Sequence, residues 1–419
     1  MKKVIAALSL IALSTFASGD YKAYSLEEAR SFRNAWTIDN WDNGGPLMRY
    51  VFLNMSEFWN HSIISRSGPV RELPANLRPD VSGFITTTDR GNLALSSYVN
   101  DSSVNAAIVV HEGKIVFESY PRMRPFDKHL YMSVSKTFAS TLIAILEDRE
   151  LIDRTSPVKN YLPDLAASGW ADVPVLDVLD MASGIDCLQQ VEGAYDNPEL
   201  CYYQFEASLG WLRTNEQTWD NTYEYIASMS PHRPSGEAFE YTSTNTFVLA
   251  WIAEQVSGRT YADLVASEIW KAIGAESDAL LTAPRHGVQI ASSGISSTLR
   301  DLARFGLLFA PSGRDALQPI VSESYLEKIQ HGGRPEIFNA GRADNVRMVD
   351  GEPARHNSYQ WDFVMEDGDF FKGGYGGQGL YISPSRDLVI AFFGSFDEDG
   401  KGHEMTRIAR QLATSGLFD

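Results

Sequence analysis

The chain has 419 residues and is acidic, with 54 aspartates and glutamates against 36 lysines and arginines and a formal net charge of −18. This charge argues against nucleic acid and anionic membrane surfaces as partners. The length is ample for a large core, built either as one big domain or as two lobes.

The first 19 residues are typical of a secretory signal peptide. Lys2 and Lys3 form a positive start, an apolar stretch runs from Val4 to Phe16, and small residues follow at positions 17–19. The apolar stretch is too short for a spanning helix, and no cysteine follows it that could carry a lipid. We therefore expect a periplasmic or secreted protein with no stable membrane anchor and a mature charge of −20, since residues 1–19 contain two lysines and no acidic residue.

Residues 20–105 are aromatic-rich and irregular, and no motif in them suggests a reaction. We expect this segment to pack on a catalytic domain that spans residues 106–419. That domain begins with a predicted β-hairpin, in which two β-branched runs flank the Glu112-Gly113 turn.

A Ser-x-x-Lys pattern follows at Ser133 and Lys136, at the entry to an apolar helix predicted over residues 137–149. Residues three apart share one face of a helix, so the two side chains can meet. A buried lysine of lowered pKa can take the proton from a serine hydroxyl and turn it into a nucleophile. The pattern is short, and its second copy at Ser156 and Lys159 is interpreted as structural.

The middle of the chain is mostly helical, with a lobe expected over about residues 150–290. Helices are predicted over residues 175–182, 222–229, 246–256 and 262–273. Between the first two lies a long polar and aromatic loop, and long loops of this kind inside a compact protein usually have a function. It holds both cysteines, Cys187 and Cys201, for which a disulfide is plausible in an oxidising compartment. No histidine lies between them, so a metal site is not expected.

The C-terminal part returns to strands. A helix is predicted over residues 299–309, a second hairpin over residues 379–393, and a final helix over residues 404–417. Strands near both ends and helices between them predict an α+β fold, in which an antiparallel sheet is flanked by helices and a helical lobe is inserted. We expect the active site in the cleft between sheet and lobe.

Two further motifs carry candidate site residues. Tyr241 stands at a helix entry in Tyr241-Thr242-Ser243, where a phenol could relay protons beside a lysine. A glycine-rich run over residues 373–379 formally fits a dinucleotide-binding pattern, but a strand rather than a helix is predicted after it. No cofactor is therefore expected. Lys372, just before the run, is either a second cation near the site or solvated.

The sequence lacks the motifs of other hydrolase mechanisms. The sequence contains no G-x-S-x-G nucleophile elbow of the α/β-hydrolases and no H-E-x-x-H zinc motif.

Together, Ser133 to Lys136, Tyr241 to Ser243 and Tyr375-Gly376-Gly377 resemble the three ordered motifs of the serine β-lactamase and penicillin-binding-protein superfamily, in its class C-like esterase and amidase branch. The resemblance covers about residue 106 to the C-terminus and implies a β-lactamase/transpeptidase-like fold. It implies that Ser133 is acylated, that Lys136 is its base, and that Tyr241 passes protons to the leaving group. The N–H groups of Ser133 and Gln378 would form the oxyanion hole.

Two positions depart from the class C pattern: the second motif ends in Ser243 instead of asparagine, and the third reads Tyr-Gly-Gly instead of Lys-Thr-Gly. Both changes weaken the case for β-lactam binding, because that lysine pairs with the drug's carboxylate. The motifs look more like those of 6-aminohexanoate-dimer hydrolases and related esterases. In that group a tyrosine from the long loop meets the amide, and Tyr195 is the candidate here.

We therefore expect a serine hydrolase that cleaves small amides or carboxylic esters through an acyl-enzyme. One alternative with the same chemistry is a β-lactamase or D-alanyl-D-alanine carboxypeptidase. The alternative from another class is a penicillin-binding-like recognition protein without turnover.

Overall fold

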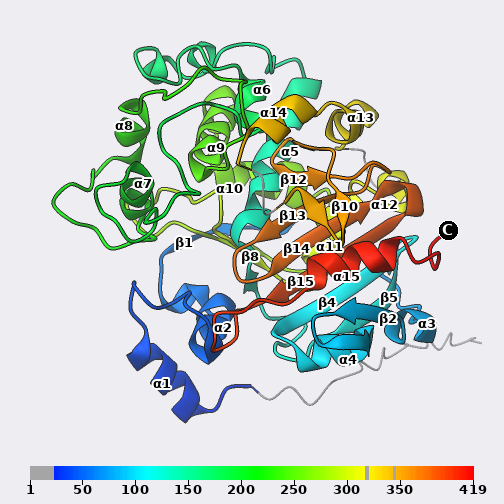
Figure 1. The fold of residues 1–419 in the computed structure, drawn as a ribbon. Helices are drawn as coiled ribbons and strands as arrows, with labels where there is room; N and C mark the ends of the chain where they lie inside the picture. Colours follow the sequence, from blue (N-terminus) through cyan, green and yellow to red (C-terminus); the bar gives the residue numbers. More distant parts are fainter. Residues whose placement is uncertain (1–22, 317–319, 343–345) are drawn as a thin grey trace, which may run out of the picture.

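A seven-stranded antiparallel sheet forms the centre of the molecule, with strand order β11-β12-β13-β14-β15-β4-β5 (Figure 1). The computed structural model describes residues 23–316, 320–342 and 346–419. The strands are β4 (Val104–His111), β5 (Lys114–Ser119), β11 (His356–Ser358), β12 (Trp361–Val364), β13 (Phe370–Gly374), β14 (Gln378–Ser383) and β15 (Leu388–Gly394). Both predicted hairpins are confirmed, as β4–β5 and as β14–β15. Strands from the two ends of the chain meet where β15 pairs with β4.

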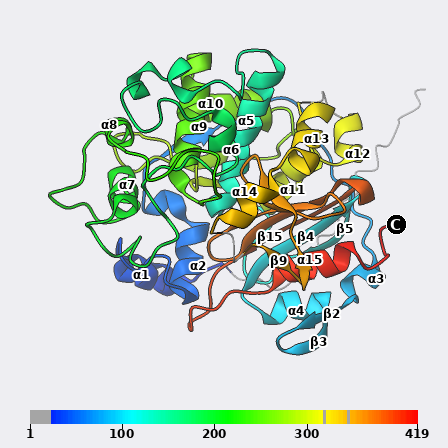
Figure 2. The same cartoon turned by 45° about the horizontal axis from the view of Figure 1, so that its top comes forward.

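Both faces of this sheet are buried, and the sequence of β15 explains why. Val389, Ala391 and Phe393 belong to one hydrophobic core, while the alternating residues Leu388, Ile390 and Phe392 belong to the other. Successive side chains of a strand point to opposite faces, so a continuous apolar run needs cover on both sides. Helices α5, α9 and α11 supply it on the first face, and α4 and α15 on the second (Figures 1 and 2).

A smaller antiparallel sheet with strand order β1-β7-β8-β6 stands beside the nucleophile motif. Its strands are β1 (His61–Ile64), β6 (His129–Leu130), β7 (Ala279–Thr282) and β8 (Ile295–Ser297). Two further hairpins are β2 (Ile85–Thr88) with β3 (Gly91–Ala94), and β9 (Met348–Val349) with β10 (Glu352–Pro353). The chain leaves β6 and runs directly into the segment that holds Ser133.

The helices of residues 136–270 gather to one side of the large sheet, as Figures 1 and 2 show. The helices of the chain are α1 (Leu26–Ala35), α2 (Gly45–Leu53), α3 (Pro79–Ser82), α4 (Leu95–Asp101), α5 (Lys136–Asp148), α6 (Val175–Leu179), α7 (Cys201–Leu209), α8 (Thr222–Ala227), α9 (Ser243–Ser257), α10 (Tyr261–Leu264), α11 (Leu299–Leu307), α12 (Pro311–Ala316), α13 (Glu323–His331), α14 (Pro335–Ala340) and α15 (Met405–Ala413). The helix expected over residues 262–273 is instead the short α10 followed by a π-helical segment, η5 (Val265–Trp270). The helix expected over residues 175–182 ends earlier, at Leu179.

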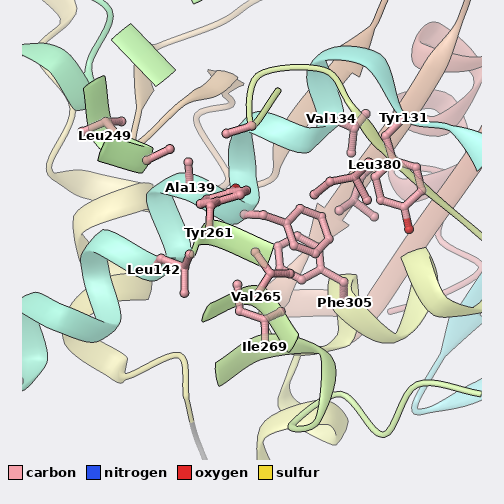
Figure 3. Close-up of a cluster of buried hydrophobic side chains, with 14 of the residues drawn as sticks. Tyr131, Val134, Ala139, Leu142, Leu249, Tyr261, Val265, Ile269, Phe305 and Leu380 are labelled. Carbon is pink, nitrogen blue, oxygen red and sulfur yellow. The ribbon is translucent and has the colours of Figure 1, made fainter. Parts of the chain in front are cut away.

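Helix α5 is the central support of the site. Every residue from Lys136 to Leu146 is buried. Its side chains Ala139 and Leu142 lie in the same apolar cluster as Leu249 of α9 and Phe305 of α11 (Figure 3). A helix buried all round cannot shift without opening a core, so its first turn is held rigidly.

The expected signal peptide at residues 1–19 lies outside the described residues. Within the described part of the chain, no helix has the length and apolar character needed to cross a bilayer.

Candidate active site

Ser133 lies in a short 3₁₀ turn, η2 (Met132–Ser135), between β6 and α5. Met132 has a φ of 48°, a left-handed conformation that is costly for a residue with a side chain. The turn is held against β8 by two hydrogen bonds, from Tyr131 N–H to the Ile295 carbonyl (2.8 Å) and from Ile295 N–H to Ser135 Oγ (3.2 Å). Ser133 thereby stands, partly exposed, in the wall of a cavity of about 640 Å³.

The Lys136 amine lies beside the Ser133 hydroxyl and is fully buried. Its Nζ is 3.2 Å from Ser133 Oγ, 3.0 Å from Ser243 Oγ and 3.0 Å from the Ser292 carbonyl oxygen. Burial lowers the pKa of Lys136 well below its usual range, and the positive charge of Lys372 lowers it further. A neutral Lys136 can donate to Ser243 and Ser292 and accept the proton of Ser133, which is the arrangement that a general base needs.

Tyr241 joins this pair to a second buried lysine. Lys372 Nζ donates to the Tyr241 hydroxyl at 3.0 Å and forms an ion pair with Asp362. Burial opposes the charge of Lys372, but Asp362 and Tyr241 outweigh it, so the pKa of Lys372 is raised. The ring of Tyr241 lies between the two amines, 5.2 Å from Lys136 Nζ and 4.7 Å from Lys372 Nζ. Burial raises the pKa of Tyr241, so its ground state is a phenol that Lys372 would stabilise on ionisation.

Ser243 is the first residue of α9 and contacts the long loop as well as Lys136. Gln189 Oε1 accepts from the Ser243 N–H at 2.9 Å and from Ser243 Oγ at 3.1 Å, which satisfies the start of the helix. Gln189 Nε2 also donates to the Tyr195 hydroxyl at 2.6 Å. Tyr195 lines the cavity, where it is 47% exposed.

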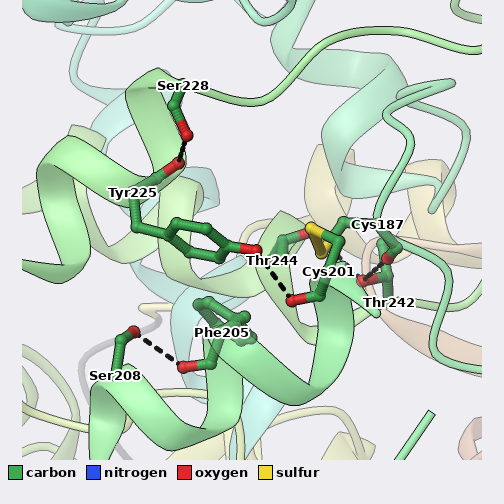
Figure 4. Close-up of a disulfide and its surroundings, with 8 residues drawn as sticks. All are labelled: Cys187, Cys201, Phe205, Ser208, Tyr225, Ser228, Thr242 and Thr244. Atoms are coloured by element: carbon green, nitrogen blue, oxygen red, sulfur yellow. Dashed lines mark hydrogen bonds between the residues drawn. A yellow bond between two sulfur atoms is a disulfide. The ribbon is translucent and has the colours of Figure 1, made fainter. Parts of the chain in front are cut away.

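The loop is held in this position by a disulfide between Cys187 and Cys201, whose Cα atoms are 5.1 Å apart (Figure 4). Thr242, the residue before Ser243, donates its hydroxyl to the Cys187 carbonyl at 2.9 Å. Cys201 begins α7, and its carbonyl accepts from the Tyr225 hydroxyl at 3.1 Å. The disulfide therefore joins the two loop segments that surround Ser243.

Strand β13 brings backbone close to the nucleophile. A Cβ on Gly374 would stand 2.4 Å from the Tyr131 carbonyl oxygen, so only glycine permits this approach. Gly373, Gly374 and Tyr375 line the cavity together with Ser133. The backbone at the end of this strand therefore shares the cavity wall with Ser133.

Comparison with known proteins agrees with this geometry. A family model described as beta-lactamase matches residues 102–415. The chain belongs to the beta-lactamase family. A 6-aminohexanoate-dimer hydrolase of Paenarthrobacter ureafaciens is 30% identical over 374 residues, which are 88% of this chain and 90% of that protein. The resemblance predicted from the three motifs is confirmed, and this member of the family is a serine hydrolase.

Solved structures share the fold of this beta-lactamase-family chain. A structure described as "Putative 6-aminohexanoate-dimer hydrolase from Bacillus anthracis" superposes with a TM-score of 0.76 at 23% identity, covering 91% of this chain and 96% of that one. A beta-lactamase/D-alanine carboxypeptidase from Yersinia pestis has a TM-score of 0.59 at 19% identity, covering 76% and 95%. The predicted α+β architecture is thereby confirmed.

Six of the predicted site residues meet around the cavity of this beta-lactamase-family site: Ser133, Lys136, Tyr195, Tyr241, Ser243 and Tyr375. Three others do not. Gly376 and Gly377 form the turn after β13, where added Cβ atoms would meet Met48 and His403. Gln378 is buried in β14, and its side-chain amide donates to the Tyr375 and Gly394 carbonyls. That the Gln378 N–H supplies an oxyanion donor stays a prediction.

The predicted third motif, Tyr375-Gly376-Gly377, lies just after β13, at the start of the turn that leads to β14. Within β13, Gly373 and Gly374 line the cavity together with Ser133, and Lys372 precedes them in the strand. The amino-acid sequence alone does not show where a strand ends within a glycine-rich run, because glycine suits both a close backbone approach and a turn. The site therefore has the lysine that the predicted motif lacked.

Several contacting residues were not found by sequence reasoning: Gln189, Tyr202, Glu206 and Asp362. Asp362 is one position beyond the cross-strand pair Phe363–Phe371, opposite Lys372, so recognising the β12–β13 hairpin would have suggested the ion pair. Tyr202 and Glu206 are four residues apart on α7, a spacing that places them on one helix face.

Proposed function

We propose that this protein is an exported serine hydrolase that cleaves linear amides or carboxylic esters through an acyl-enzyme on Ser133. The observation that carries the proposal is the buried Lys136 amine, 3.2 Å from Ser133 Oγ, with a pKa held well below its usual range by burial. A lysine whose pKa is lowered in this way loses its proton more readily and can act as a base.

In the proposed acylation step, Lys136 takes the proton of Ser133 as Oγ attacks the substrate carbonyl. The N–H groups of Ser133 and Tyr375 hold the oxyanion. Tyr241 gives its proton to the leaving nitrogen or oxygen, and Lys372 stabilises the phenolate until the proton on Lys136 replaces the one lost. Water then attacks the acyl-enzyme, and the same groups move protons in the reverse direction.

The ion pair of Lys372 favours this reading over a β-lactamase or a D-alanyl-D-alanine carboxypeptidase. Substrates of both alternatives carry a carboxylate that a free lysine at this strand could bind. Here Asp362, itself a carboxylate, already pairs with Lys372 and also accepts from the Gly373 N–H at 2.8 Å. A second carboxylate would meet a neutralised cation and an anion.

The cavity supports a substrate with an apolar arm. Its walls include Phe239, Phe363, Phe371 and Val349, and Met348 stands 57% exposed at its edge. The relative from Paenarthrobacter ureafaciens is named as a 6-aminohexanoate-dimer hydrolase. A linear amide or an ester with an aliphatic chain is therefore the proposed substrate class.

Export is proposed from two observations. The first 19 residues have the composition of a secretory signal, and Cys187 and Cys201 form a disulfide. N-terminal sequencing of the protein from the periplasm or the medium tests this, and we expect a new N-terminus near residue 20. Finding the intact chain in the cytoplasm would overturn it.

An assay panel tests the reaction. A short acyl p-nitrophenyl ester, a linear amide dimer and a chromogenic cephalosporin are offered to the wild type and to Ser133→Ala. We expect the ester and the amide to be hydrolysed, little cephalosporin turnover, and loss of activity in Ser133→Ala with an acyl adduct on Ser133 in the wild type. Ser156→Ala, in the second copy of the same pattern, is the matched control and should keep full activity.

The outcomes separate the alternatives. Full activity in Ser133→Ala contradicts the mechanism, and rapid cephalosporin turnover with negligible ester hydrolysis favours the β-lactamase. Slow acylation without turnover of any substrate favours the recognition protein.

A further inference from the structure

A chain of hydrogen bonds leads from Lys136 away from Ser133 to a buried carboxyl group. Lys136 Nζ donates to Ser243 Oγ at 3.0 Å, Ser243 Oγ is 3.1 Å from the Tyr202 hydroxyl, and that hydroxyl is 2.5 Å from Glu206 Oε1. Four polar groups thus connect the base of the site to α7. The acylation step described above does not use the last two of them.

All members of this chain are shielded from water. Lys136 is 0% exposed, Tyr202 1%, Ser243 3% and Glu206 5%. Separating an ammonium and a carboxylate in such surroundings is costly, whereas a neutral amine and a neutral carboxylic acid carry no buried charge. One proton held between Lys136 and Glu206 therefore keeps the buried pair neutral overall wherever it rests.

Other charged and titratable groups face the two ends. Lys372 and Asp362, from β13 and β12, act on Lys136, and Tyr241 places its ring against it. Asp42, from the segment before α2, acts on Glu206, and Tyr195 stands against Tyr202 with ring centroids 5.2 Å apart. Burial is the largest cause that raises the pKa of Glu206, to about 7, while Tyr202 and Lys136 oppose the rise.

We propose that Glu206 is a second acid–base group of this site, which exchanges a proton with Lys136 through the hydroxyls of Ser243 and Tyr202. The proposal rests on the proposed function, since it assigns Lys136 as the base. The transfer balances: Lys136 gives a proton to Ser243 Oγ, Ser243 gives its own to the Tyr202 oxygen, and Tyr202 gives its own to Glu206. Lys136 is then neutral, Glu206 is protonated, and both hydroxyls are restored.

Gln189 affects the direction in which the Ser243 hydroxyl donates its proton. Its Oε1 accepts from Ser243 Oγ at 3.1 Å, while the Tyr202 hydroxyl is placed to donate to Ser243 Oγ at 3.1 Å or to Glu206 Oε1 at 2.5 Å. In the proposed transfer Tyr202 donates to Glu206, and the Ser243 proton turns from Gln189 to Tyr202. With the proton toward Tyr202 the chain to Glu206 is continuous. Glu206 does not touch the substrate cavity, so it is a positioning residue for the proton of Lys136.

The test measures Lys136 directly. The protein is labelled with ¹³C at lysine Cε, the Lys136 signal is assigned by its absence in Lys136→Met, and its titration midpoint is followed by NMR in the wild type and in Glu206→Gln. Removing the carboxylate removes the negative charge that favours the ammonium, so we expect the midpoint to fall by about one pH unit or more. The acidic limb of kcat/KM for the ester should move to lower pH by the same amount.

Two further variants complete the design. Tyr202→Phe cuts the chain and leaves Glu206 without this hydrogen bond, which favours the neutral carboxyl, so the Lys136 midpoint should again fall. Glu254→Gln is the matched control, because Glu254 also has a pKa raised by burial and also bonds a tyrosine, but lies at the far end of α9 from Ser243. It should leave both readouts unchanged.

The proposal is overturned if the Lys136 midpoint in Glu206→Gln and Tyr202→Phe stays within about 0.2 pH units of the wild type, or if Glu254→Gln moves it equally. The NMR titration needs no turnover. Activity retained in Ser133→Ala would contradict the proposed function, while the Lys136 midpoint would still report on Glu206.

Discussion

Lys372 is the residue on which the choice of substrate depends most. Its amine is fully buried, donates to the Tyr241 hydroxyl at 3.0 Å, and forms an ion pair with Asp362. Removing one partner of such a buried ion pair leaves the other partner's charge without its counter-ion. Asp362 therefore serves as a built-in carboxylate, at the place where a carboxylate of the substrate could otherwise bind.

Replacing Asp362 with asparagine should change the specificity of the site. The shape of the side chain is kept, while Lys372 loses its counter-ion and becomes available to a substrate carboxylate. We expect Asp362→Asn to gain about tenfold in the acylation rate with a chromogenic cephalosporin, the effect of one charge-assisted hydrogen bond. Stopped-flow acylation measures it, with the uncharged p-nitrophenyl ester as reference; an equal change for both substrates would contradict the argument.

Among the elements, β13 and the η2 turn are packed too closely to admit a side chain between them. A Cβ on Gly374 would stand 2.4 Å from the Tyr131 carbonyl oxygen, well inside any normal contact. The approach sets the end of β13 against the segment that leads into Ser133, so it couples the large sheet to that residue.

Gly374→Ala should therefore push β13 away from η2 and misplace one oxyanion donor. Loss of such a donor lowers kcat by about 100-fold, and we expect a loss of that size in ester hydrolysis with the fold retained by circular dichroism. Gly402→Ala is the control, because the atom nearest to its added Cβ would be Phe396 Cε1, 3.4 Å away, which is an ordinary van der Waals contact. An active Gly374→Ala enzyme would show that Tyr375 is not part of the oxyanion hole.

The loop between α6 and α7 contributes to the site through its disulfide. Cys187 lies two residues before Gln189 and Cys201 one residue before Tyr202, and both of those side chains contact Ser243. Closing a loop of about 15 residues restricts the unfolded chain and stabilises the folded one by about 3 kcal/mol.

The double variant Cys187→Ser, Cys201→Ser should therefore lose about 3 kcal/mol of unfolding free energy and should also lose activity, because Ser243 loses its loop partners. Chemical denaturation and kcat/KM measure the two effects, and the reduced wild type should behave like the variant. A destabilised variant with unchanged kcat/KM would mean that the loop holds its position without the disulfide.

On the scale of the whole molecule, a buried histidine connects the two sheets. His129 of β6 is fully buried, accepts from Asn105 Nδ2 of β4 at 2.9 Å through Nε2, and donates from Nδ1 to the Leu130 carbonyl at 2.9 Å. Its ring stacks on Phe393 of β15 with centroids 4.6 Å apart. This set of partners suits a neutral imidazole, and burial lowers the pKa of His129 to about 4.

The stability of the protein should therefore depend on pH through His129. Its pKa is about 6.5 in the unfolded chain and about 4 in the folded one, so between these values the unfolded state binds more protons. The stabilisation is complete above pH 6.5 and is lost as the pH falls to 4. Between pH 7.5 and 4.5 the wild type should lose about 2.5 kcal/mol of unfolding free energy more than His129→Gln.

Urea denaturation at the two pH values measures this difference. Acidic groups of raised pKa, such as Asp180, act in the opposite sense, but they are common to both proteins and cancel in the comparison. His61→Gln, at an exposed position of β1, is the control and should keep the wild-type dependence. Equal pH dependence in wild type and His129→Gln would contradict the assignment.

Much of the fold follows from local patterns. The β4–β5 hairpin was predictable because β-branched runs flank the Glu112-Gly113 turn, and the β14–β15 hairpin because a Pro-Ser-Arg-Asp turn separates two apolar runs. Residues close together in the sequence determine hairpins of this kind. The divided helix at Tyr261–Trp270 and the early end of α6 were missed, because packing in the helical region changes the hydrogen-bond pattern without changing the apolar period.

The residues of the candidate site also fall into those that local patterns predict and those that depend on tertiary contacts. Ser133 and Lys136 are three residues apart, and helix geometry alone brings them together. Asp362 was missed because the register of the β12–β13 hairpin was not predicted, and Glu206 because its link to Lys136, through Tyr202 and Ser243, joins segments far apart in the chain.

The sequence by itself determined the pairing of Ser133 with Lys136, the family and the two hairpins, since each depends on residues close together along the chain. Only the tertiary structure decided that Lys372 is neutralised by Asp362, that Gly373, Gly374 and Tyr375 line one cavity with Ser133, and that Glu206 connects to Lys136. The physical reason is that strand register and helix docking decide which distant side chains share a buried space. Burial then determines their charge.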